Sequence, residues 1–252
     1  HSSCSHVRAA DMVHRAIEIG LQALVITDHH YLWTSEDLQK LRQEAGVPEI
    51  FYIFAGQEVD SKDFGHILVY GADESIPPGR KVEDIRRQWP DSAIIWAHPY
   101  RKGYEPPDKR LQNPAFDAIE IFSSNYSVSE SMKALRAWHR LKFTAVSGTD
   151  THAVSYTGSY PTIFDHPVDS LEKLIQEIKA GRCRPYFKER PRSGTTNTQI
   201  MELTVGPKAS EKRQEMVVKT YETSEAWQEA ERTHQVTEKI MANGFNSGQF
   251  RI

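Results

Sequence analysis

The alternation of short apolar segments with amphipathic segments is the feature that most constrains the fold of this chain. Six segments between residues 22 and 148 have the length and composition of strands: ALVITD, IFYIFAGQEV, HILVYG, AIIWAH, AIEIFSS and FTAVSG. Apolar spacing and cap residues predict helices in AADMVHRAIEIG, SEDLQKLRQEAG, VEDIRRQW, SESMKALRAWHRL and SLEKLIQEIKAG. Near-continuous apolar strands that alternate with helices predict an α/β fold with a parallel sheet buried on both faces.

Two architectures fit this alternation, an open doubly wound sheet and a barrel. No GxGxxG or GxxxxGK[ST] motif follows any predicted strand, so the usual markers of a nucleotide-binding open sheet are missing. Polar side chains instead gather at the ends of several different strands, as they do at the mouth of a barrel. The sequence therefore favours a TIM-like barrel.

The length of 252 residues suits one large domain, or a domain with a tail. From about Lys188 the chain becomes polar and contains prolines, so we expect the barrel to occupy residues 1–187 and a polar linker with a helical extension to occupy 188–252. Helices are predicted there in KASEKRQEMVVK and SEAWQEAERTHQVTEKIMANG. We expect this extension to pack on the barrel; a partner-binding or oligomerising arm is the alternative.

Composition narrows the partners and the compartment. A formal net charge of −3 gives no global attraction for a polyanion, so nucleic acid is a less favoured partner than a small phosphorylated substrate. Two cysteines, Cys4 and Cys183, are too few for a disulfide framework, which favours a reducing compartment such as the cytoplasm. No apolar run approaches the ~18 residues of a membrane span, so no membrane partner is expected.

Side chains that can bind metal ions recur at the strand ends. They are Asp28, His29, Glu58, His66, His98, Asp150 and His152. A single histidine at a strand end is more often a structural residue than a ligand, but burying so many imidazoles and carboxylates without a partner would cost several kcal/mol. Nitrogen and oxygen ligands suit zinc, manganese or iron, and their number exceeds the need of one ion. We therefore expect two or three divalent ions, with Glu58 as a bridging ligand.

Six motifs resemble one known family. In chain order, HSSCSH, ITDHH, GQEV, HILVYG, AHPYR and SGTDTH are similar to the successive motifs of the polymerase and histidinol phosphatase (PHP) family of metal-dependent phosphoesterases. The resemblance extends from residue 1 to about residue 186 and includes TGSYPTIF and AGRCRP. Each motif is weak alone, whereas six in register are specific.

The resemblance implies a distorted seven-stranded (β/α)7 barrel that holds up to three divalent ions at its mouth. It implies one ion held by His1, Glu58 and Asp150, a second by Glu58, His66 and His98, and a third by His6, His29 and His152. His1 corresponds to the second histidine of a His-x-His pair, so a strand and a first histidine are expected upstream of residue 1. Many members have Asp where this chain has His6, and we expect the replacement to shift metal preference.

Other residues near these motifs have two interpretations each. Arg101 and Lys102 follow the strand that ends at His98, and they either bind the substrate phosphate or belong to a solvated loop. Asp28 either orients a group at the site or makes a structural hydrogen bond. His30 either donates to substrate or is inert, and Glu120, inside a predicted strand, needs a buried partner.

The function expected from these observations is metal-dependent hydrolysis of a small phosphomonoester, or of a small phosphodiester, by hydroxide generated at the ions. The main alternative among enzymes is a nuclease that acts on DNA or RNA ends. A noncatalytic, metal-stabilised binding module is the alternative outside catalysis. A metal-dependent hydrolase of carbon–nitrogen bonds is disfavoured, because the order of AHPYR and SGTDTH does not resemble that group.

Overall fold

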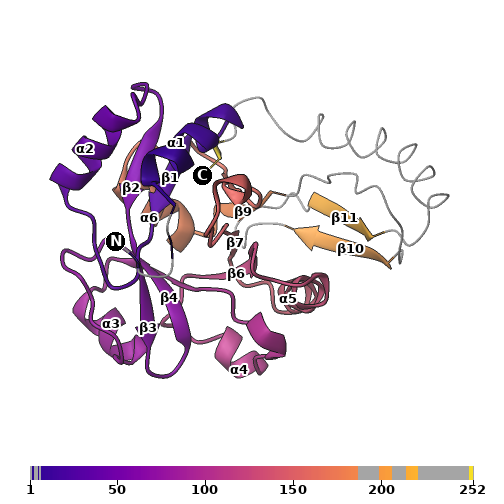
Figure 1. Ribbon diagram of the computed structural model, residues 1–252. Helices are drawn as coiled ribbons and strands as arrows, with labels where there is room; N and C mark the ends of the chain where they lie inside the picture. Colours follow the sequence, from indigo (N-terminus) through magenta and orange to yellow (C-terminus); the bar gives the residue numbers. More distant parts are fainter. Residues whose placement is uncertain are drawn as a thin grey trace, which may run out of the picture. The chain divides into compact units, whose positions relative to one another are not determined.

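The computed structural model describes residues 2, 5, 7–186, 199–205, 214–220 and 250–251. Its contacts divide the chain into two units, one of residues 1–187 with 250–252 and one of residues 188–249. The helices of the first unit are α1 (Ala9–Glu18), α2 (Ser35–Glu44), α3 (Val82–Gln88), α4 (Asp108–Leu111), α5 (Val128–Leu141) and α6 (Leu171–Lys179), with short 3-10 turns η1 (Arg101–Gly103) and η2 (Val154–Tyr156). Its strands are β1 (Ala23–Ile26), β2 (Tyr52–Ala55), β3 (Gln57–Ser61), β4 (Gly65–Tyr70), β5 (Ala93–Trp96), β6 (Ala118–Phe122), β7 (Ala145–Ser147), β8 (Thr162–Phe164), β9 (Cys183–Pro185) and β12 (Phe250–Arg251) (Figure 1).

All six predicted strands and all five predicted helices of this unit are present, which confirms the α/β class. The predicted strand IFYIFAGQEV is divided at Gly56 into β2 and β3. The division has a steric cause, since a Cβ at Gly56 would lie 2.5 Å from the Tyr70 ring. The backbone therefore passes this ring at a distance that only glycine allows.

The central sheet is mixed, so the prediction of a parallel sheet is only partly right. Its strand order is β3-β4-β5-β6-β7. The pairs β5–β6 and β6–β7 are parallel, whereas β3–β4 and β4–β5 are antiparallel. Only residues 62–64 separate β3 from β4, and a connection this short can form a hairpin but no crossover.

A second ladder brings β1 beside β2 and continues past Gly56 into β3. The parallel pairing of β1 with β2 ends at Ile26 and Ala55, and an isolated parallel bridge then joins His29 to Glu58. Hydrogen bonds from Glu58 N to Asp28 O and from His30 N to Glu58 O hold this extension together. Residues 28–30 therefore lie against the start of β3.

The expected seven-stranded barrel is not closed by backbone pairing among the described strands. The strands β12, β8 and β9 form a separate antiparallel sheet, and no ladder joins them to β7. Side chains take the place of that ladder, because Ser147 N donates to Thr162 Oγ1 at 3.0 Å and Thr162 Oγ1 donates to Ser147 O at 2.8 Å. A threonine hydroxyl inserted between two backbones keeps β7 and β8 close and unpaired.

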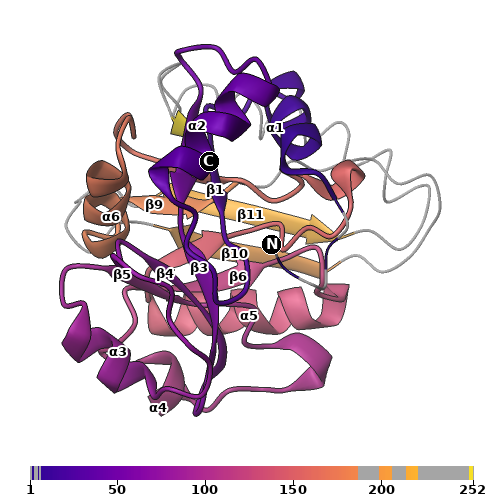
Figure 2. The same ribbon diagram turned by 60° about the vertical axis from the view of Figure 1, so that its left-hand side comes forward.

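The helices of this unit lie outside the strands (Figure 2). Helix α5 packs on β6, α6 on β5, and α1 and α2 on β1 and β2. Every residue of β5 and β6 is buried, as expected for strands covered on both faces. Burying each isoleucine of these strands stabilises the fold by about 1.5–3 kcal/mol. The buried strands thus hold the side chains that follow them in defined positions.

In the second unit, the prediction of a helix in KASEKRQEMVVK is wrong for its described residues, which form a strand. Strands β10 (Gln199–Val205) and β11 (Gln214–Thr220) form an antiparallel pair with Gln199 opposite Thr220. Residues 214–219 were included in the predicted helix KASEKRQEMVVK, and their β-branched Val217 and Val218 favour the strand instead. The predicted helix SEAWQEAERTHQVTEKIMANG lies outside the described residues.

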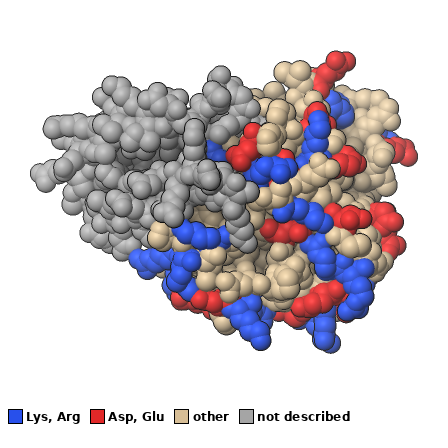
Figure 3. Space-filling view, turned by 180° about the vertical axis from the view of Figure 1, so that it is seen from behind, with Lys and Arg blue, Asp and Glu red and all other residues tan. Residues whose placement is uncertain are grey.

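Two surface properties bear on partners. Within the part of the chain that the structure describes, no helix is long and apolar enough to cross a membrane. Figure 3 shows that, among the residues that the structure describes, basic and acidic side chains are interspersed on one face of the molecule.

Candidate metal centre

The strand ends deliver the polar side chains to one place. Asp28 and His29 follow β1, His98 follows β5 and Asp150 follows β7, all of them at carboxyl ends. Strand β4 is antiparallel to β5, so its amino-terminal end, with His66, reaches the same edge. Glu58 comes from β3 beside His29. Six residues from five strands thus meet through the topology of the sheet.

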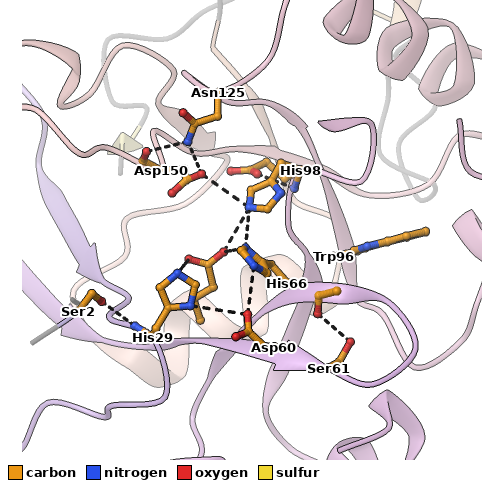
Figure 4. A network of polar contacts seen from close by, with 12 residues as sticks. Ser2, His29, Asp60, Ser61, His66, Trp96, His98, Asn125 and Asp150 are labelled. Atoms are coloured by element: carbon orange, nitrogen blue, oxygen red, sulfur yellow. Dashed lines mark hydrogen bonds and ion pairs between the residues drawn. The ribbon is translucent and has the colours of Figure 1, made fainter. Parts of the chain in front are cut away.

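Glu58 is the centre of this cluster. Figure 4 labels its neighbours His29, His66 and His98. Its Oε1 lies 2.8 Å from His66 Nδ1 and 3.2 Å from His98 Nε2. Its Oε2 lies 3.5 Å from His29 Nε2. Because the two imidazole nitrogens of His66 and His98 are themselves only 3.3 Å apart, three lone-pair-bearing atoms converge on one small volume.

The charge state of this cluster follows from its burial and its partners. Burial opposes ionisation of Glu58, yet hydrogen bonds and positive charge from His66 and His98 hold the pKa of its carboxyl far below the usual range. Burial likewise disfavours the charged form of His98, but Glu58, Glu120 and Asp150 raise its pKa. The site therefore favours an ionised carboxylate and attracts positive charge.

Asp150 and His152 extend the cluster on the β7 side. Asp150 Oδ2 lies 3.6 Å from His98 Nε2 and accepts a hydrogen bond from Asn125 Nδ2. His152 Nδ1 lies 3.1 Å from the Asp150 carbonyl oxygen and 3.8 Å from Asp150 Oδ1, and its side chain is 40% exposed. Asp150 thus belongs to the buried cluster, whereas His152 lies at its edge.

Glu120 lies beneath His98. The Glu120 side chain is almost completely buried, and its Oε2 accepts a hydrogen bond of 2.7 Å from the His98 backbone N–H. Burial, together with the negative charges of Asp150 and Glu58, raises the pKa of Glu120 to about 7 despite the opposing effect of His98. The sequence predicts a buried partner for Glu120, and that partner is the backbone N–H of His98.

Three residues of the site have a left-handed backbone. The φ angles are 53° at His30, 29° at His98 and 44° at Asp150. Such conformations cost about 1–3 kcal/mol each in residues other than glycine and are concentrated at functional sites. The fold therefore maintains an unfavourable local backbone in order to direct these side chains.

A cavity of about 200 Å³ opens beside the cluster. Its polar lining includes Asp28, His29, Glu58, His98, Glu120, Asp150 and His152. Its apolar wall includes Leu24, Ile26, Leu68 and Tyr70, which come from the strands. No lysine or arginine among the described residues lines it.

The donor set fits a divalent cation. Ligand atoms that bind one ion at ~2.0–2.1 Å lie about 3 Å apart, which is the separation of Glu58 Oε1, His66 Nδ1 and His98 Nε2. His29, Glu58 and His66 also offer three ligand atoms within 4.8 Å of one another. Asp60 Oδ1 is buried and makes no hydrogen bond of acceptable geometry. Unshared lone pairs at this density are what a bound cation satisfies.

Asp60 and His30 form a part of the site for which the sequence analysis had no ligand role. His30 Nε2 lies 3.0 Å from Asp60 Oδ2, and the group of His29, His30 and Asp60 has metal-binding spacing. Asp60 follows Glu58 by two residues in β3, and side chains at that spacing share one face of a strand. The Glu58–Asp60 spacing can be read in GQEVDS, but the place of Asp60 in the site becomes clear only from the strand register.

The remaining candidate residues are placed as follows. His1 and His6 lie outside the described residues. The Asp28 carboxylate lines the cavity and accepts hydrogen bonds from Ser2 N and, at 2.6 Å, from Trp33 Nε1. Burial opposes ionisation of Asp28, but these two donors lower its pKa. Arg101 is half-buried and Lys102 exposed, and neither lines the cavity.

One family model matches the chain. Residues 129–183 match the family described as PHP-associated, a range that extends from α5 to β9 and includes Asp150 and His152. No curated protein sequence matches the chain. The family match confirms the resemblance to the PHP family that the sequence motifs indicate.

Solved structures that are similar to the chain include the following two. PsfC from Pseudomonas syringae PB-5123 is 16% identical, with a TM-score of 0.55 over 71% of this chain and 82% of that chain. A "putative metal-dependent phosphoesterase" from Bifidobacterium adolescentis is 12% identical, with a TM-score of 0.43 over 57% of this chain and 82% of that chain. At 16% identity, the likeness to PsfC concerns the fold alone.

Proposed function

We propose, from the match of residues 129–183 to the PHP-associated family, from the motifs that resemble the PHP family and from the cluster of donor atoms, that this chain is a metal-dependent phosphoesterase. It would hydrolyse a small phosphomonoester or small phosphodiester. The observation that carries the proposal is the convergence of His66 and His98 on the Glu58 carboxylate. Glu58 lies in β3, His66 in β4 and His98 just after β5, and Glu58 and His98 are buried. A purely structural role would not require so many imidazoles beside one ionised carboxylate.

We assign the ligands by their contacts. Glu58, His66 and His98 would hold one ion, and Asp150 and His29 would extend the site toward a second and a third, with Glu58 shared. Zinc, manganese and iron all accept such a mixture of imidazole and carboxylate. Bound ions would lower the pKa of coordinated water and neutralise charge on the phosphate.

The cavity supports a small substrate. A volume of about 200 Å³ is below the ~300–1,000 Å³ of pockets that enclose drug-sized ligands. Since no described lysine or arginine lines it, charge compensation for a phosphate there would come from cations. Arg101 and Lys102, in the loop after β5, would then contact only a part of the substrate outside the cavity.

The residues of the chain would hold and orient the reactants. Glu120 accepts from the backbone N–H of His98, and Asn125 donates to the carboxylate of Asp150, so a neighbouring side chain holds each ligand residue in place. The apolar wall of Leu24, Leu68 and Tyr70 keeps one side of the cavity dry, which strengthens every electrostatic interaction within it.

The full chain, freed of metal and reloaded with zinc, manganese or iron(II), should be assayed on phosphorylated small molecules, nucleotides and single-stranded oligonucleotides. We expect phosphate release from small monoesters, and a loss of about 100-fold or more in Glu58→Gln and Asp150→Asn. The exposed Asp91→Asn is the control and should retain full activity.

Two outcomes would contradict the proposal. Release of mononucleotides from the oligonucleotides, with no activity on small monoesters, would favour a nuclease. If metal-loaded Asp150→Asn released phosphate as fast as the wild type, the cluster would not be the site of hydrolysis. This outcome would favour a noncatalytic, metal-stabilised module.

A further inference from the structure

We propose that Asp60 is a positioning residue that holds the imidazoles of His66 and His29 with their other ring nitrogens directed at Glu58. This inference rests on the proposed metal-dependent function. It assigns to Asp60 a task that none of the sequence motifs indicates, since the carboxylate lies outside the set of expected ligands.

The register of the β3–β4 hairpin creates this arrangement. Asp60 is paired with His66 across the hairpin, and Glu58 lies two residues earlier on the same face of β3. The His66 ring therefore lies between two carboxylates. Its Nδ1 is 2.8 Å from Glu58 Oε1, and its Nε2 is 3.1 Å from Asp60 Oδ1.

His29, from the end of another strand, lies between the same two carboxylates at longer distances. Its Nε2 is 3.5 Å from Glu58 Oε2, and its Nδ1 is 3.8 Å from Asp60 Oδ1. The two rings meet edge to face, with centroids 5.1 Å apart. The Asp60 carboxylate thus faces one ring nitrogen of His29 and one of His66, the rear nitrogens (Figure 4). The other ring nitrogen of each imidazole, the front nitrogen, faces Glu58.

The position of Asp60 determines which ring nitrogen of each imidazole can bind a cation. A neutral ring carries one N–H and one lone pair, and only the lone pair binds a cation. A carboxylate that accepts the rear N–H leaves the lone pair on the front nitrogen, restricts rotation of the ring and makes the front nitrogen more basic. Asp60 would do this for His66 at Nε2 and for His29 at Nδ1.

Asp60 is itself held for this task. Its Oδ1 is buried without a hydrogen bond of good geometry, so it is available to both rear nitrogens. Its other oxygen, Oδ2, lies 3.0 Å from His30 Nε2, and His30 Nδ1 lies 3.3 Å from the Ile76 carbonyl. The left-handed backbone of His30 directs its ring toward Asp60, which fixes the carboxylate from the side opposite to Oδ1.

The test measures zinc binding by the full chain in competition with a chromophoric chelator. We expect Asp60→Ala to bind zinc about 10–100-fold more weakly than the wild type, the usual effect of losing a carboxylate that orients a metal-binding histidine. Asp60→Asn keeps a carbonyl oxygen as acceptor and should recover part of the loss. Asp63→Ala is the matched control, because Asp63 belongs to the same hairpin but accepts from Val82 N rather than from an imidazole.

A second measurement distinguishes orientation from general damage. In zinc-loaded protein labelled with ¹⁵N-histidine, the His66 Nε2–H should give a resolved, slowly exchanging NMR signal in the wild type and in Asp60→Asn, and an exchange-broadened one in Asp60→Ala. Equal zinc affinity and an unchanged His66 signal in Asp60→Ala would overturn the inference while leaving the proposed function intact. Zinc binding that depends on Asp60 in a chain that hydrolyses no phosphoester would leave the inference intact and overturn the function.

Discussion

Gly148 provides the space that the carboxylate of Glu120 occupies. A Cβ atom at position 148 would overlap Glu120 Oε1, and its next contact would be with the carboxyl carbon of the same side chain. Gly148 lies directly after β7, and its N–H donates to the Phe122 carbonyl at the end of β6. A side chain at position 148 would therefore displace the Glu120 carboxylate from its present position.

The first prediction is that Gly148→Ala disturbs the metal centre through Glu120. A displaced carboxylate would no longer accept the His98 N–H, so we expect weaker zinc binding and lower phosphatase activity with little change in secondary structure. Zinc titration and circular dichroism would measure this. In a Glu120→Ala background the overlap disappears, so Gly148→Ala should then add little; fully additive effects would show that Glu120 is not the intermediary.

The second prediction separates the acceptor role of Glu120 from its charge. Glu120→Ala leaves the buried His98 N–H without a partner, which should lower the free energy of unfolding by about 1–3 kcal/mol. Glu120→Gln retains an acceptor oxygen and should lose much less. Chemical denaturation of both metal-free variants would measure the difference, and equal losses in the two would indicate that packing volume, rather than the hydrogen bond, is what Glu120 contributes.

The strand and helix pattern could be predicted because it depends on local periodicity. β5, with four consecutive buried residues, and α5, with a Ser127–Glu130 capping box, have signals that are contained in their own sequences. Pairing direction is a nonlocal property. The antiparallel β4 and the side-chain link between Ser147 and Thr162 could not be read from segments considered one at a time.

The same distinction applies to the site. The convergence of His29, Glu58, His66, His98 and Asp150 could be predicted because each lies at or near the end of a predicted strand, and strand ends meet at an edge. Asp60 was missed because its importance depends on the register that places it opposite His66. Arg101 and Lys102 follow the right strand, but the η1 turn, with Lys102 at φ 58°, keeps them out of the cavity lining.

The third prediction concerns removal of metal. Cations that bind only the folded cluster should stabilise it, by about 2.7 kcal/mol at a free concentration 100 times the dissociation constant. We therefore expect a chelator to lower the thermal unfolding midpoint of the wild type and added zinc to restore it. Glu58→Gln removes the central carboxylate, so its midpoint should respond much less to either treatment. A wild-type midpoint that is indifferent to zinc and chelator would contradict the assignment of this cluster as a metal centre.

The fourth prediction concerns Glu177, which lies far from the candidate metal centre in sequence and stabilises the end of α6. Glu177 is 5% exposed, and its Oε1 accepts hydrogen bonds of 2.6 and 3.0 Å from the Arg182 guanidinium. His166 Nδ1 lies 3.0 Å from its Oε2. Burial opposes ionisation, but Arg182 and His166 together lower the pKa of Glu177 below its ordinary value.

A carboxyl whose pKa is lower in the folded than in the unfolded state adds stability that is fully present above the unfolded value of ~4.3 and is lost as the pH falls through the folded value. We therefore expect Glu177→Gln to be less stable than the wild type by about 1 kcal/mol near neutral pH, and the difference to shrink as the pH falls below about 4. Urea denaturation across this pH range would measure it, with the exposed Glu49→Gln as the control. A difference that stays constant with pH would mean that Glu177 contributes by packing and neutral hydrogen bonding, and that its charge adds nothing to the link between α6 and Arg182.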